Sequence, residues 1–388
     1  MNGDHLTLRD PVEFAQTRPV SIASPSVEIE HAPSAPASSP SGTTLVLINF
    51  GTAARTIRCL ASVARCEPAP DRVLVLDNAS EARDFATLAS EIAPLPASAL
   101  RLYRSPVNLG FAAGSNFLVH AALDDPACRQ VALLNNDAVA ETHFLSSLSR
   151  ALGPDPAATG LAGGRMDRLG EPGCPDTLGI SLYASLMPAN RLDAADPYLG
   201  PTGGCCLLSR GLVERLVAVS GYCFDPRYFC YCEDTDLALR AVMLGFRPAW
   251  APETVALHEG QASSGADSEF IAYHGLRNLV WMHAKLVPGR TFAKYGLLLA
   301  AAHAMTVVRQ GLMGRIGLMG RVCRDAFARL PEFRAERARF AREAVATAAD
   351  LDRLIAPRFY RRGYFAEVLA SIRRRWRRSP GTNRGRAG

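Results

Sequence analysis

VALLNND, residues 131–137, is an apolar run that stops abruptly at three polar side chains. A short apolar run bounded by turn-forming residues predicts a strand that is buried on both faces, as in a parallel sheet. In open α/β sheets ligands bind where such strands end, because the carboxyl edges of neighbouring strands form a crevice there. We therefore expect the side chain of Asp137 to lie at a functional site.

Strand-like and helix-like segments alternate on the N-terminal side of this run. The expected strands are TTLVLIN (43–49), RVLVLDN (72–78) and Leu100–Arg104, and helical periodicity covers 53–66 and the segment that ends near Leu123. Strands that alternate with helices predict an α/β fold, with a mostly parallel, doubly wound sheet and helices on both faces.

The pattern changes after the apolar run. A helix is expected from Glu141 to Leu152, but Gly153–Gly203 is rich in glycine and proline and has no regular pattern. The elements expected beyond it are a strand at 205–209 (CCLLS), a helix at Gly211–Ser220, a helix at Glu233–Leu244 ended by Gly245, and a strand at 254–257 (TVAL). The second of these helices would carry acidic residues in its first turn, where the helix dipole favours negative charge.

Length and composition favour one large domain with appendages. The chain has 388 residues, more than a single core usually holds, and 48% of them are apolar. Ten cysteines without a signal-peptide-like start predict reduced, cytosolic side chains. From Lys285 onwards basic residues outnumber acidic ones by 23 to 7, whereas residues 1–284 have 20 basic and 30 acidic residues. A basic block of this kind usually faces phosphate, in nucleic acid or in anionic lipid.

Three regions follow from these patterns. Residues 1–42 are expected as a disordered Ala/Pro/Ser-rich extension, because they lack the apolar side chains to fold, and 43–285 as the globular domain. Residues 286–388 are expected as a basic helical region, in which 295–308 form a core or interfacial helix, with a membrane-spanning helix as the less favoured alternative. The basic, aromatic run within 364–378 is typical of attachment to an anionic membrane surface, with a solvated tail as the alternative.

The candidate metal ligands are Asp137 and His258. Magnesium and manganese prefer oxygen ligands, and one or two protein carboxylates suffice when substrate phosphates complete the shell. Asp137 is the best-placed carboxylate at a strand end. His258 follows the expected strand at 254–257, so its imidazole would also lie at the sheet edge.

The acidic pair Glu233 and Asp234 is the candidate general base. It follows the aromatic run Tyr228–Tyr231, and a carboxylate in an apolar pocket has a raised pKa, which suits a base for a sugar hydroxyl. We favour Asp234, although spacing alone does not separate it from Glu233. For Asp236 we expect only a favourable interaction with the helix dipole.

The first two strands end in polar side chains that could contact a nucleotide. Asp77 and Asn78 end the second strand, and Asn49 ends the first, at positions where α/β sheets bind a base or ribose. The chain lacks the GxGxxG spacing after its first strand and also lacks the Walker pattern, so neither a dinucleotide site nor a Walker site is expected.

Taken in order, these motifs resemble those of the family 2 glycosyltransferases, especially their rhamnosyltransferase-like branch. They span about residues 43–285 and comprise the strand that ends at Asn49, VLDNAS, NLGFAAGSN, LLNND, TGGCCLLSR, FDPRYFCYCEDTDLALRAVMLG, His258 and YHGLRN. The resemblance implies a GT-A fold and inverting transfer of a sugar, with rhamnose as a candidate, from a nucleotide-diphosphate donor. One departure is Asn135, which stands where the DXD motif of the family begins, so that Asp137 carries the only charge of that motif.

The resemblance also implies roles for single residues. Asp137 would bind a divalent cation, Mg²⁺ or Mn²⁺, that arrives largely with the donor diphosphate, and His258 would assist it. Asp234 would be the catalytic base, with Glu233 beside it. The residues expected to bind the donor are Asn49, Asp77, Asn78, Asn108, Gly110, Phe111, Gly114, Asn116, Asn136 and Arg277, the last to neutralise phosphate.

The expected acceptor is a hydroxyl of a glycan or lipid-linked saccharide, in cell-surface polysaccharide assembly at the cytoplasmic face of the membrane. Two other functions stay open at this point. A nucleotidyltransferase of sugar phosphates would need a basic, glycine-rich loop after the first strand, and Phe50–Arg55 has a single arginine. A non-enzymatic protein that binds phosphate or nucleic acid would need a basic face on its body, which is acidic instead.

Overall fold

The computed structural model describes residues 27–30, 41–92, 99–260 and 268–378. The extension expected at residues 1–42 lies almost wholly outside these ranges. Its described part includes β1 (Val27–Glu30), which pairs antiparallel with β4 (Ala99–Ser105). Those four residues therefore belong to the sheet, contrary to the expectation of a disordered segment.

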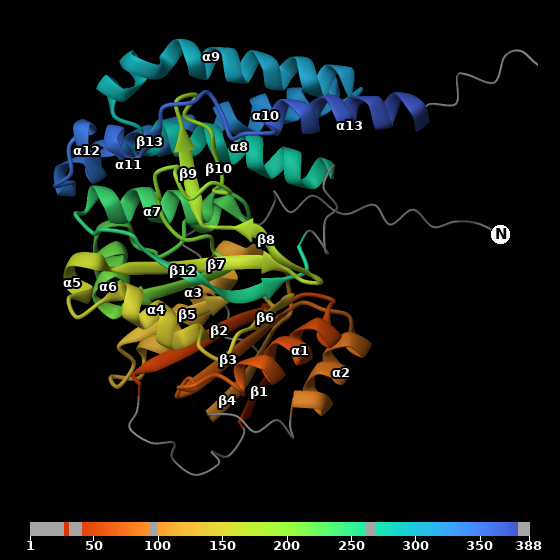
Figure 1. Ribbon diagram of the computed structural model, residues 1–388, viewed down its shortest axis with the longest axis vertical. Coiled ribbons are helices and arrows are strands. Elements are labelled where there is room, and N and C mark those ends of the chain that lie inside the picture. Colours follow the sequence, from red (N-terminus) through yellow and green to blue (C-terminus); the bar gives the residue numbers. More distant parts are fainter. Residues whose placement is uncertain (1–26, 31–40, 93–98, 261–267, 379–388) are drawn as a thin grey trace, which may run out of the picture.

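Four parallel strands form the N-terminal half of the central sheet, in the order β4-β3-β2-β5 (Figure 1). The other three are β2 (Thr43–Asn49), β3 (Arg72–Asn78) and β5 (Gln130–Leu134). Their apolar runs are buried, as the continuous hydrophobic pattern predicts. Asn49 lies opposite Asp77 in the ladder, so the polar ends of these strands meet at one edge.

Helices cover both faces of this half of the sheet. α1 (Ala53–Val63), α2 (Ala82–Ile92) and α4 (Phe144–Leu152) pack on one face, and α3 (Gly110–Leu123) packs on the other. The sequence pattern predicts all of them except α2, in which only Leu88 and Ile92 are buried. The α/β, doubly wound class is confirmed.

The sheet continues beyond β5 with strands of both directions. β11 (Cys205–Ser209) runs antiparallel between β5 and β7 (Leu161–Arg168). β12 (Ala249–His258) runs parallel to β7, and β6 (Ala138–Ala140) closes the edge antiparallel to β12. The expected parallel order thus holds for the N-terminal half, and the reversal at β11 makes the whole sheet mixed.

The glycine- and proline-rich stretch after α4 contains elements that the sequence pattern does not predict. They are α5 (Pro156–Thr159), β7, β8 (Glu171–Thr177), β9 (Ile180–Tyr183) and β10 (Pro188–Asn190). β9 forms a small second sheet with β10 and β13 (Ile355–Ala356). Glycine is needed for close packing here, because a Cβ at Gly164 would collide with the Val255 side chain. Such residues give no hydrophobic period from which a strand could be predicted.

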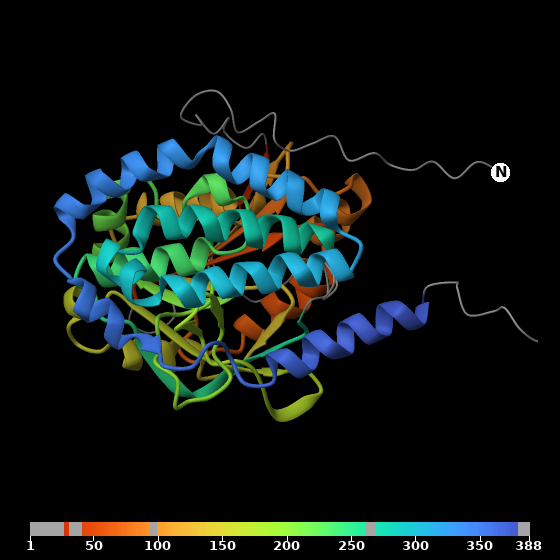
Figure 2. The ribbon, with the colours of Figure 1, turned by 90° about the horizontal axis from the view of Figure 1, so that it is seen from above.

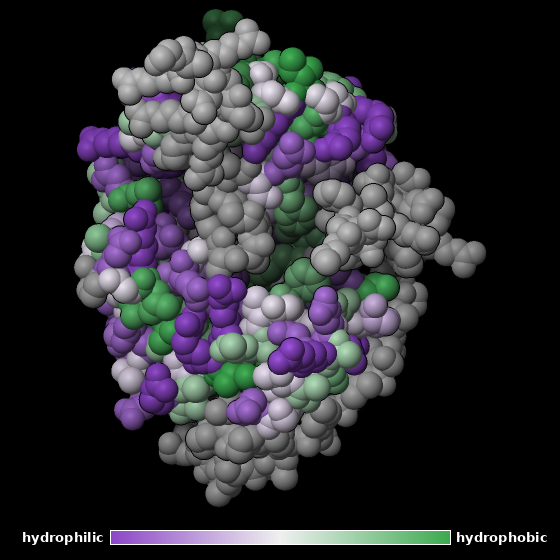
Figure 3. Space-filling view, turned by 90° about the vertical axis from the view of Figure 1, so that its right-hand side faces the viewer, coloured by the Kyte–Doolittle hydropathy of each residue, from purple (hydrophilic) through white to green (hydrophobic). Residues whose placement is uncertain are grey.

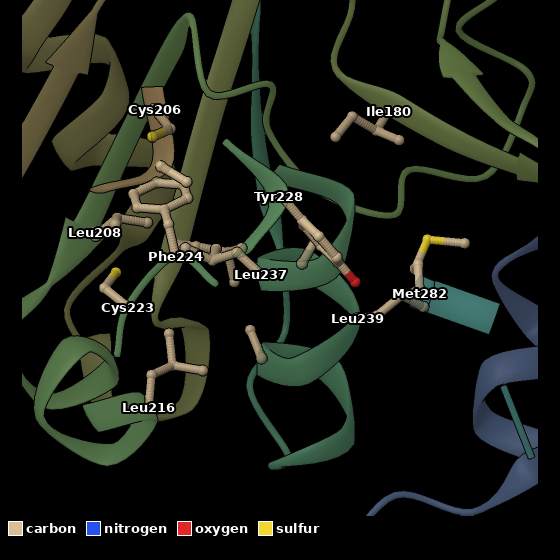
Figure 4. Packing of buried hydrophobic residues seen from close by; sticks show 14 of the residues in the cluster. Ile180, Cys206, Leu208, Leu216, Cys223, Phe224, Tyr228, Leu237, Leu239 and Met282 are labelled. Atoms are coloured by element: carbon tan, nitrogen blue, oxygen red, sulfur yellow. The ribbon is translucent and has the colours of Figure 1, made fainter. Parts of the chain in front are cut away.

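A layer of helices covers one side of the molecule (Figures 1 and 2). Its members are α8 (Glu269–Leu286), α9 (Gly289–Leu312), α10 (Ile316–Ala328), α11 (Leu330–Glu343), α12 (Ala348–Arg353) and α13 (Tyr364–Arg378). Two earlier helices, α6 (Arg210–Ser220) and α7 (Glu233–Met243), share a hydrophobic cluster with α3. In that cluster Leu239 of α7 and Met282 of α8 lie near Tyr228 (Figure 4), and Phe333 of α11 belongs to it as well. The boundary expected at residue 285 therefore falls inside one continuous core.

Residues 295–308 lie in α9, and α9 is not a core helix. Only Thr291, Ala302 and Gln310 are buried among its residues. Of the helices in the described ranges, it is the one whose length and composition would allow it to cross a membrane. Its place at the outside of the helical layer (Figure 1) contradicts the core alternative.

Candidate active site

A cavity of about 1360 Å³ lies between the carboxyl edge of the sheet and the helical layer. Figure 3 shows a hollow between the two, with hydrophobic side chains in its depth. Residues at the ends of β2, β3 and β5 line one part of the cavity, and residues of α8 and α9 line another. Its volume exceeds that of a typical pocket for one small ligand, so two ligands can occupy it together.

Asp137 and His258 meet at the edge of the sheet. Asp137 follows β5, and β12 pairs with β6 so that His258 lies opposite Ala138. His258 Nε2 is 3.0 Å from Asp137 Oδ1, and Asn135 Nδ2 is 3.5 Å from the same nitrogen. Residues from distant parts of the chain thus form one polar centre on the cavity wall.

Asp176 contacts the other nitrogen of the His258 ring. Its Oδ2 lies 2.8 Å from His258 Nδ1, and it comes from β8, in the stretch without predicted elements. A hydrogen bond at Nδ1 orients the imidazole and directs Nε2 towards Asp137. Asp176 is not predictable from the sequence, because no predicted strand or motif marks that part of the chain.

These acidic neighbours change the acidity of the centre. Burial by itself lowers the pKa of His258, but the hydrogen bonds to Asp137 and Asp176 outweigh burial and raise the pKa to about 9. Burial likewise raises the pKa of Asp137, yet the hydrogen bond and charge of His258 outweigh it, and this pKa lies below its ordinary value. Near neutral pH the centre therefore holds a protonated imidazole between two acidic side chains.

The centre fits a divalent cation as two ligands of a larger shell. Asp137 offers an anionic oxygen, and His258 Nε2 offers a nitrogen once its proton has left, while Asp176 keeps the ring in place. In the part of the chain that the structure describes, no three His, Cys, Asp or Glu side chains form a metal-binding group. A cation here would take its remaining ligands from a bound diphosphate or from water.

Five of the expected donor-binding residues line the cavity, namely Asn78, Asn108, Gly110, Phe111 and Asn136. Asn78 Nδ2 donates to Asn108 Oδ1 at 3.0 Å, which joins the end of β3 to the loop before α3. Asn136 Nδ2 donates to Thr52 Oγ1 at 2.7 Å, which joins the segment after β5 to the start of α1. Side-chain amides therefore tie the strand ends together around the cavity.

Arg55 lines the cavity too, although the sequence pattern gives it no donor role. Its guanidinium pairs with Glu259 at 2.9 Å, and Arg58 pairs with the same carboxylate. The hydrogen bonds from these arginines lower the pKa of Glu259 to about 2. An arginine in the first turn of α1 can bind phosphate in exchange for this carboxylate. The only sign of it in the sequence is a lone arginine after the first predicted strand.

Five other expected donor-binding residues do not line the cavity, namely Asn49, Asp77, Gly114, Asn116 and Arg277. Asp77 is fully buried, and its carboxylate accepts hydrogen bonds from Asn49 Nδ2 at 2.9 Å and from the Ser80 backbone N–H at 3.3 Å. Asp77 therefore does not line the cavity, and the nucleoside contact expected of it stays a prediction. Asp77 and Asn49 instead hold the ends of β2 and β3 together beneath the cavity.

Gly114 and Asn116 serve the packing of α3. A Cβ at Gly114 would lie 3.1 Å from Ile48, so glycine lets the helix approach β2 closely. Asn116 Nδ2 donates to the Phe224 carbonyl at 2.7 Å, and the Phe224 N–H donates to Asn116 Oδ1 at 2.8 Å. Both residues position α3 and its neighbours without reaching the cavity.

Arg277 lies under the loop before α7 and does not face the cavity. Its Nη2 donates to the Tyr228 carbonyl at 3.2 Å and to Asn278 Oδ1 at 2.9 Å. Burial lowers the pKa of this guanidinium. These contacts let Arg277 support the loop, and the role in neutralising phosphate stays a prediction.

Asn278 holds the same loop through its side-chain nitrogen. Nδ2 is a donor to three carbonyls at 2.7–2.9 Å, those of Tyr228, Cys230 and Tyr231. The loop needs this support because three of its residues have left-handed φ angles of 66–68°, which residues with a Cβ disfavour. They are Phe229, Tyr231 and Cys232.

Glu233 and Asp234 begin α7 directly after this loop and line the cavity. Asp234 Oδ2 accepts from the Gly203 N–H at 3.2 Å, and its Oδ1 accepts from the Thr235 N–H at 2.6 Å. Burial raises the pKa of Asp234 despite these bonds. Burial and the charge of Asp234 raise the pKa of Glu233 well above its ordinary value, and Glu233 Oε2 has no hydrogen-bond partner among the described residues.

Asp236 is fully buried. It forms ion pairs, which the sequence does not predict, in addition to the expected interaction with the helix dipole. Its carboxylate pairs with Arg240 at 2.5 Å and with Lys285 at 2.8 Å. Lys285 also pairs with Asp225 at 2.8 Å. This buried ion-pair cluster joins α7 to the end of α8.

The sequence matches a known family over most of the described sheet. The match is to "Glycosyltransferase like family 2" and covers residues 40–276, more than half of the chain. The chain belongs to this family. The resemblance to family 2 glycosyltransferases, which the ordered motifs suggest, is therefore confirmed for this glycosyltransferase.

A curated relative matches a short part of the glycosyltransferase. N-acetylglucosaminyl-diphospho-decaprenol L-rhamnosyltransferase of Mycobacterium tuberculosis, found in two strains, is 36% identical over 86 residues. The match covers 22% of this chain and 27% of the relative. The glycosyltransferase thus aligns with about a quarter of the length of the curated relatives that it matches.

Two solved structures are similar to the glycosyltransferase in fold. GalNAc-T7 with UDP, GalNAc and Mn²⁺ has a TM-score of 0.50 at 12% identity, over 75% of this chain and 56% of that chain. The mannosyltransferase PcManGT of Pyrobaculum calidifontis, with GDP-Man and Mn²⁺, has a TM-score of 0.48 at 17% identity, over 79% and 86%. The GalNAc-T7 likeness bears on the fold alone, and the GT-A fold expected from the sequence is confirmed.

Proposed function

We propose that this glycosyltransferase moves a sugar, with inversion, from a nucleotide-diphosphate donor to an acceptor hydroxyl. The observation that carries the proposal is that Asp234, with its raised pKa, lines the same cavity as the Asp137–His258 centre. A group that takes a proton and a centre that receives negative charge are the two parts that a single displacement needs.

The donor would occupy the part of the cavity at the strand ends. Asn78, Asn108 and the backbone at Gly110 would contact the nucleoside, with Phe111 and Asn136 beside them. Arg55 would bind the diphosphate after it leaves Glu259. Asp77 and Asn49 would act indirectly, by fixing the strand ends on which these contacts depend.

Asp137 and His258 would hold Mg²⁺ or Mn²⁺ together with the donor diphosphate. The chemistry that the cation supplies there is neutralisation of the charge that develops on the leaving nucleotide diphosphate. His258 would lose its Nε2 proton on binding, and Asp176 would keep the ring in the required orientation. GalNAc-T7, which is similar in fold, was solved with UDP and Mn²⁺, and this supports a divalent cation beside the donor nucleotide.

Asp234 would remove the proton of the acceptor hydroxyl as its oxygen attacks the anomeric carbon. The N–H groups of Gly203 and Thr235 hold the carboxylate in one orientation. Glu233, whose pKa lies well above its ordinary value, would stay protonated and add no second negative charge. One displacement inverts the anomeric carbon and requires no covalent intermediate.

Rhamnose is the sugar that we propose, and a glycan or lipid-linked saccharide is the acceptor. The support is the name of the Mycobacterium tuberculosis relative, which specifies an L-rhamnosyl group and a diphospho-decaprenol carrier. We place the enzyme at the cytoplasmic face of the membrane, in the assembly of cell-surface polysaccharide. The basic C-terminal tail that begins with α13 would contact anionic lipid there, because arginines fill its last turns.

A panel of nucleotide sugars tests the donor assignment. A ligand that binds only the native state raises the midpoint of thermal unfolding, so the shift is measured with and without Mn²⁺. We expect a nucleotide-diphosphate sugar to raise the midpoint, and to raise it further with Mn²⁺. If no nucleotide sugar stabilises the protein, donor binding is contradicted; a shift that is the same without Mn²⁺ contradicts the metal assignment.

A further inference from the structure

The outer face of α9 is apolar along most of the helix. Every exposed residue from 297 to 312 is apolar. Leu297, Ala301, Ala304, Val308 and Leu312 recur at intervals of three or four residues, so they share one side of the helix. Leu297 is 89% exposed and Val308 61%, and no charged residue lies between Lys294 and Arg309. Figure 3 shows hydrophobic surface at the top of the molecule, where α9 lies in Figure 1.

Three polar residues in the C-terminal half of α9 face the opposite way. Thr306, Arg309 and Gln310 line the cavity, and Gln310 Oε1 is buried without a hydrogen-bond partner among the described residues. A helix on the surface of a water-soluble domain normally has its apolar side inside and its polar side in water. α9 packs Phe292, Tyr295 and Leu299 against the core in the usual way, but its exposed side is apolar as well, which suits an apolar medium outside.

Positive charge borders this apolar face. Arg290 and Lys294 are exposed near the start of α9, and Arg321 and Arg324 are exposed on the neighbouring α10. Lys294, Arg321 and Arg324 each have an acidic partner, namely Asp352, Glu269 and Asp325. α13 also contacts α9 and exposes Phe365. Between residues 285 and 378 the described chain has 21 basic and 7 acidic residues, so the helical layer has a net positive charge that favours an anionic surface.

We propose that α9 lies in the surface of an anionic lipid bilayer with its Leu297–Leu312 face among the upper acyl chains. Met305 is 42% exposed and also lines the cavity, so the cavity opens at the edge of this face. The docked protein would therefore present its cavity to molecules held in the bilayer. The proposal concerns α9 and does not depend on sugar transfer or on the tail beyond α13.

The same observations favour a bilayer surface over two other surroundings for α9. A second copy of the chain would bring two basic borders together, whereas anionic lipid neutralises them. A helix that crosses the bilayer would be surrounded by lipid, but Thr306, Arg309 and Gln310 face the protein. α9 also contacts α10, α12 and α13, which hold it along the molecule.

Sedimentation of the full chain with vesicles tests the proposal through a matched pair of variants. Val308 is 61% exposed on the α9 face, and Val345 is 69% exposed between α11 and α12. We expect Val308→Asp to lower the partition coefficient onto phosphatidylglycerol-containing vesicles by about tenfold or more, because one buried valine accounts for roughly that factor. Val345→Asp should bind as wild type does. Equal binding of all three proteins would overturn the proposal.

Two further measurements make the outcome specific to α9. With lipids brominated on the upper acyl chain, Leu298→Trp should lose more fluorescence than wild type, whose own tryptophans include Trp376 of α13, and an equal loss would overturn insertion. Light scattering without vesicles should give the same mass for wild type and Val308→Asp. A wild-type dimer that Val308→Asp dissociates would overturn the proposal and assign the face to a second copy. Equal thermal midpoints for Val308→Asp and Val345→Asp exclude misfolding as the cause of lost binding.

Discussion

The Nδ1 atom of His258 lies 2.8 Å from Oδ2 of Asp176, which joins the last residue of β12 to β8. Asp137 contacts the opposite nitrogen of the same ring at 3.0 Å. The ring is therefore fixed from both sides before any ligand arrives. Asp176 touches neither the cation nor the donor in the proposed reaction, so its contribution is to position His258.

Replacement of Asp176 by alanine should weaken Mn²⁺ binding in the presence of a nucleoside diphosphate by about 10- to 100-fold, because His258 loses its orienting partner. Electron paramagnetic resonance of free Mn²⁺ measures this affinity without any turnover. Asp176→Asn should retain part of the affinity, since the amide oxygen still accepts from Nδ1. Glu171→Gln, on the same strand but exposed, is the control. Wild-type affinity in Asp176→Ala would refute the positioning role.

Replacement of Asp234 by asparagine should lower kcat by about 10²- to 10⁴-fold, the usual contribution of a positioned base. The amide keeps the size of the side chain but cannot take the proton of the acceptor. Donor binding, measured by thermal shift, should change little, because Asp234 acts on the acceptor. Glu233→Gln should lower kcat less than Asp234→Asn does. A kcat for Asp234→Asn within a few-fold of wild type would show that another group is the base.

The rate should fall in acid at a higher pH than an ordinary aspartate would require. Asp234 must be ionised to act as a base, and burial raises its pKa. Its activity is therefore present above this raised pKa and lost as the pH falls through it, above the ordinary value of about 3.9. The profile of kcat against pH, at saturating donor and Mn²⁺, measures the acid limb. A limb at or below the ordinary value would contradict the assignment.

Removal of the Lys285 ammonium should destabilise the whole protein. Lys285→Met leaves the buried carboxylates of Asp225 and Asp236 without a cation that lies 2.8 Å from each, a change that costs about 3–5 kcal/mol of unfolding free energy. Urea unfolding followed by circular dichroism measures it. Lys294→Met, which removes an exposed pair with Asp352, should have a small effect. Similar midpoints for the two variants would count against the buried cluster as a source of stability.

The same ion-pair cluster should make the protein less stable in acid. Burial by itself raises the pKa of Asp225, but Lys285 and Arg227 outweigh burial and hold it well below its ordinary value. The stabilisation is complete above the unfolded pKa of roughly 4 and is lost as the pH falls below it. Urea midpoints between pH 5 and pH 3 should fall more steeply for wild type than for Lys285→Met. Parallel pH dependences would contradict this contribution.

The strands of the N-terminal half are predictable from sequence because their apolar runs are continuous and end in polar residues. VALLNND places Asp137 at the cavity, and the same logic places Asn78 there. The sequence pattern does not show which of these polar side chains stay at the surface. Asp77 stands in an equivalent position but is buried, because Asn49 and Ser80 satisfy its carboxylate inside the fold.

The rest of the site depends on contacts between distant parts of the chain. The pairing of β12 with β6 brings His258 to Asp137, and no local pattern encodes that ladder. Asp176 comes from a strand whose glycine and proline residues hide its period. The resemblance predicts that Arg277 neutralises phosphate, but it does not predict that Arg277 donates to the Tyr228 carbonyl from α8.

The contacts of the Asn278 side chain imply an order in which the parts of the site form. Every proposed metal and base residue precedes α8, which begins at Glu269, yet the left-handed loop before Asp234 depends on a residue within that helix. During synthesis the sheet can form before α8 has left the ribosome, whereas the base reaches its final place only afterwards. A growing chain would therefore acquire its catalytic geometry together with the helices that we propose to face the bilayer. The ability to transfer a sugar and the ability to bind the membrane would then arise in the same step of folding.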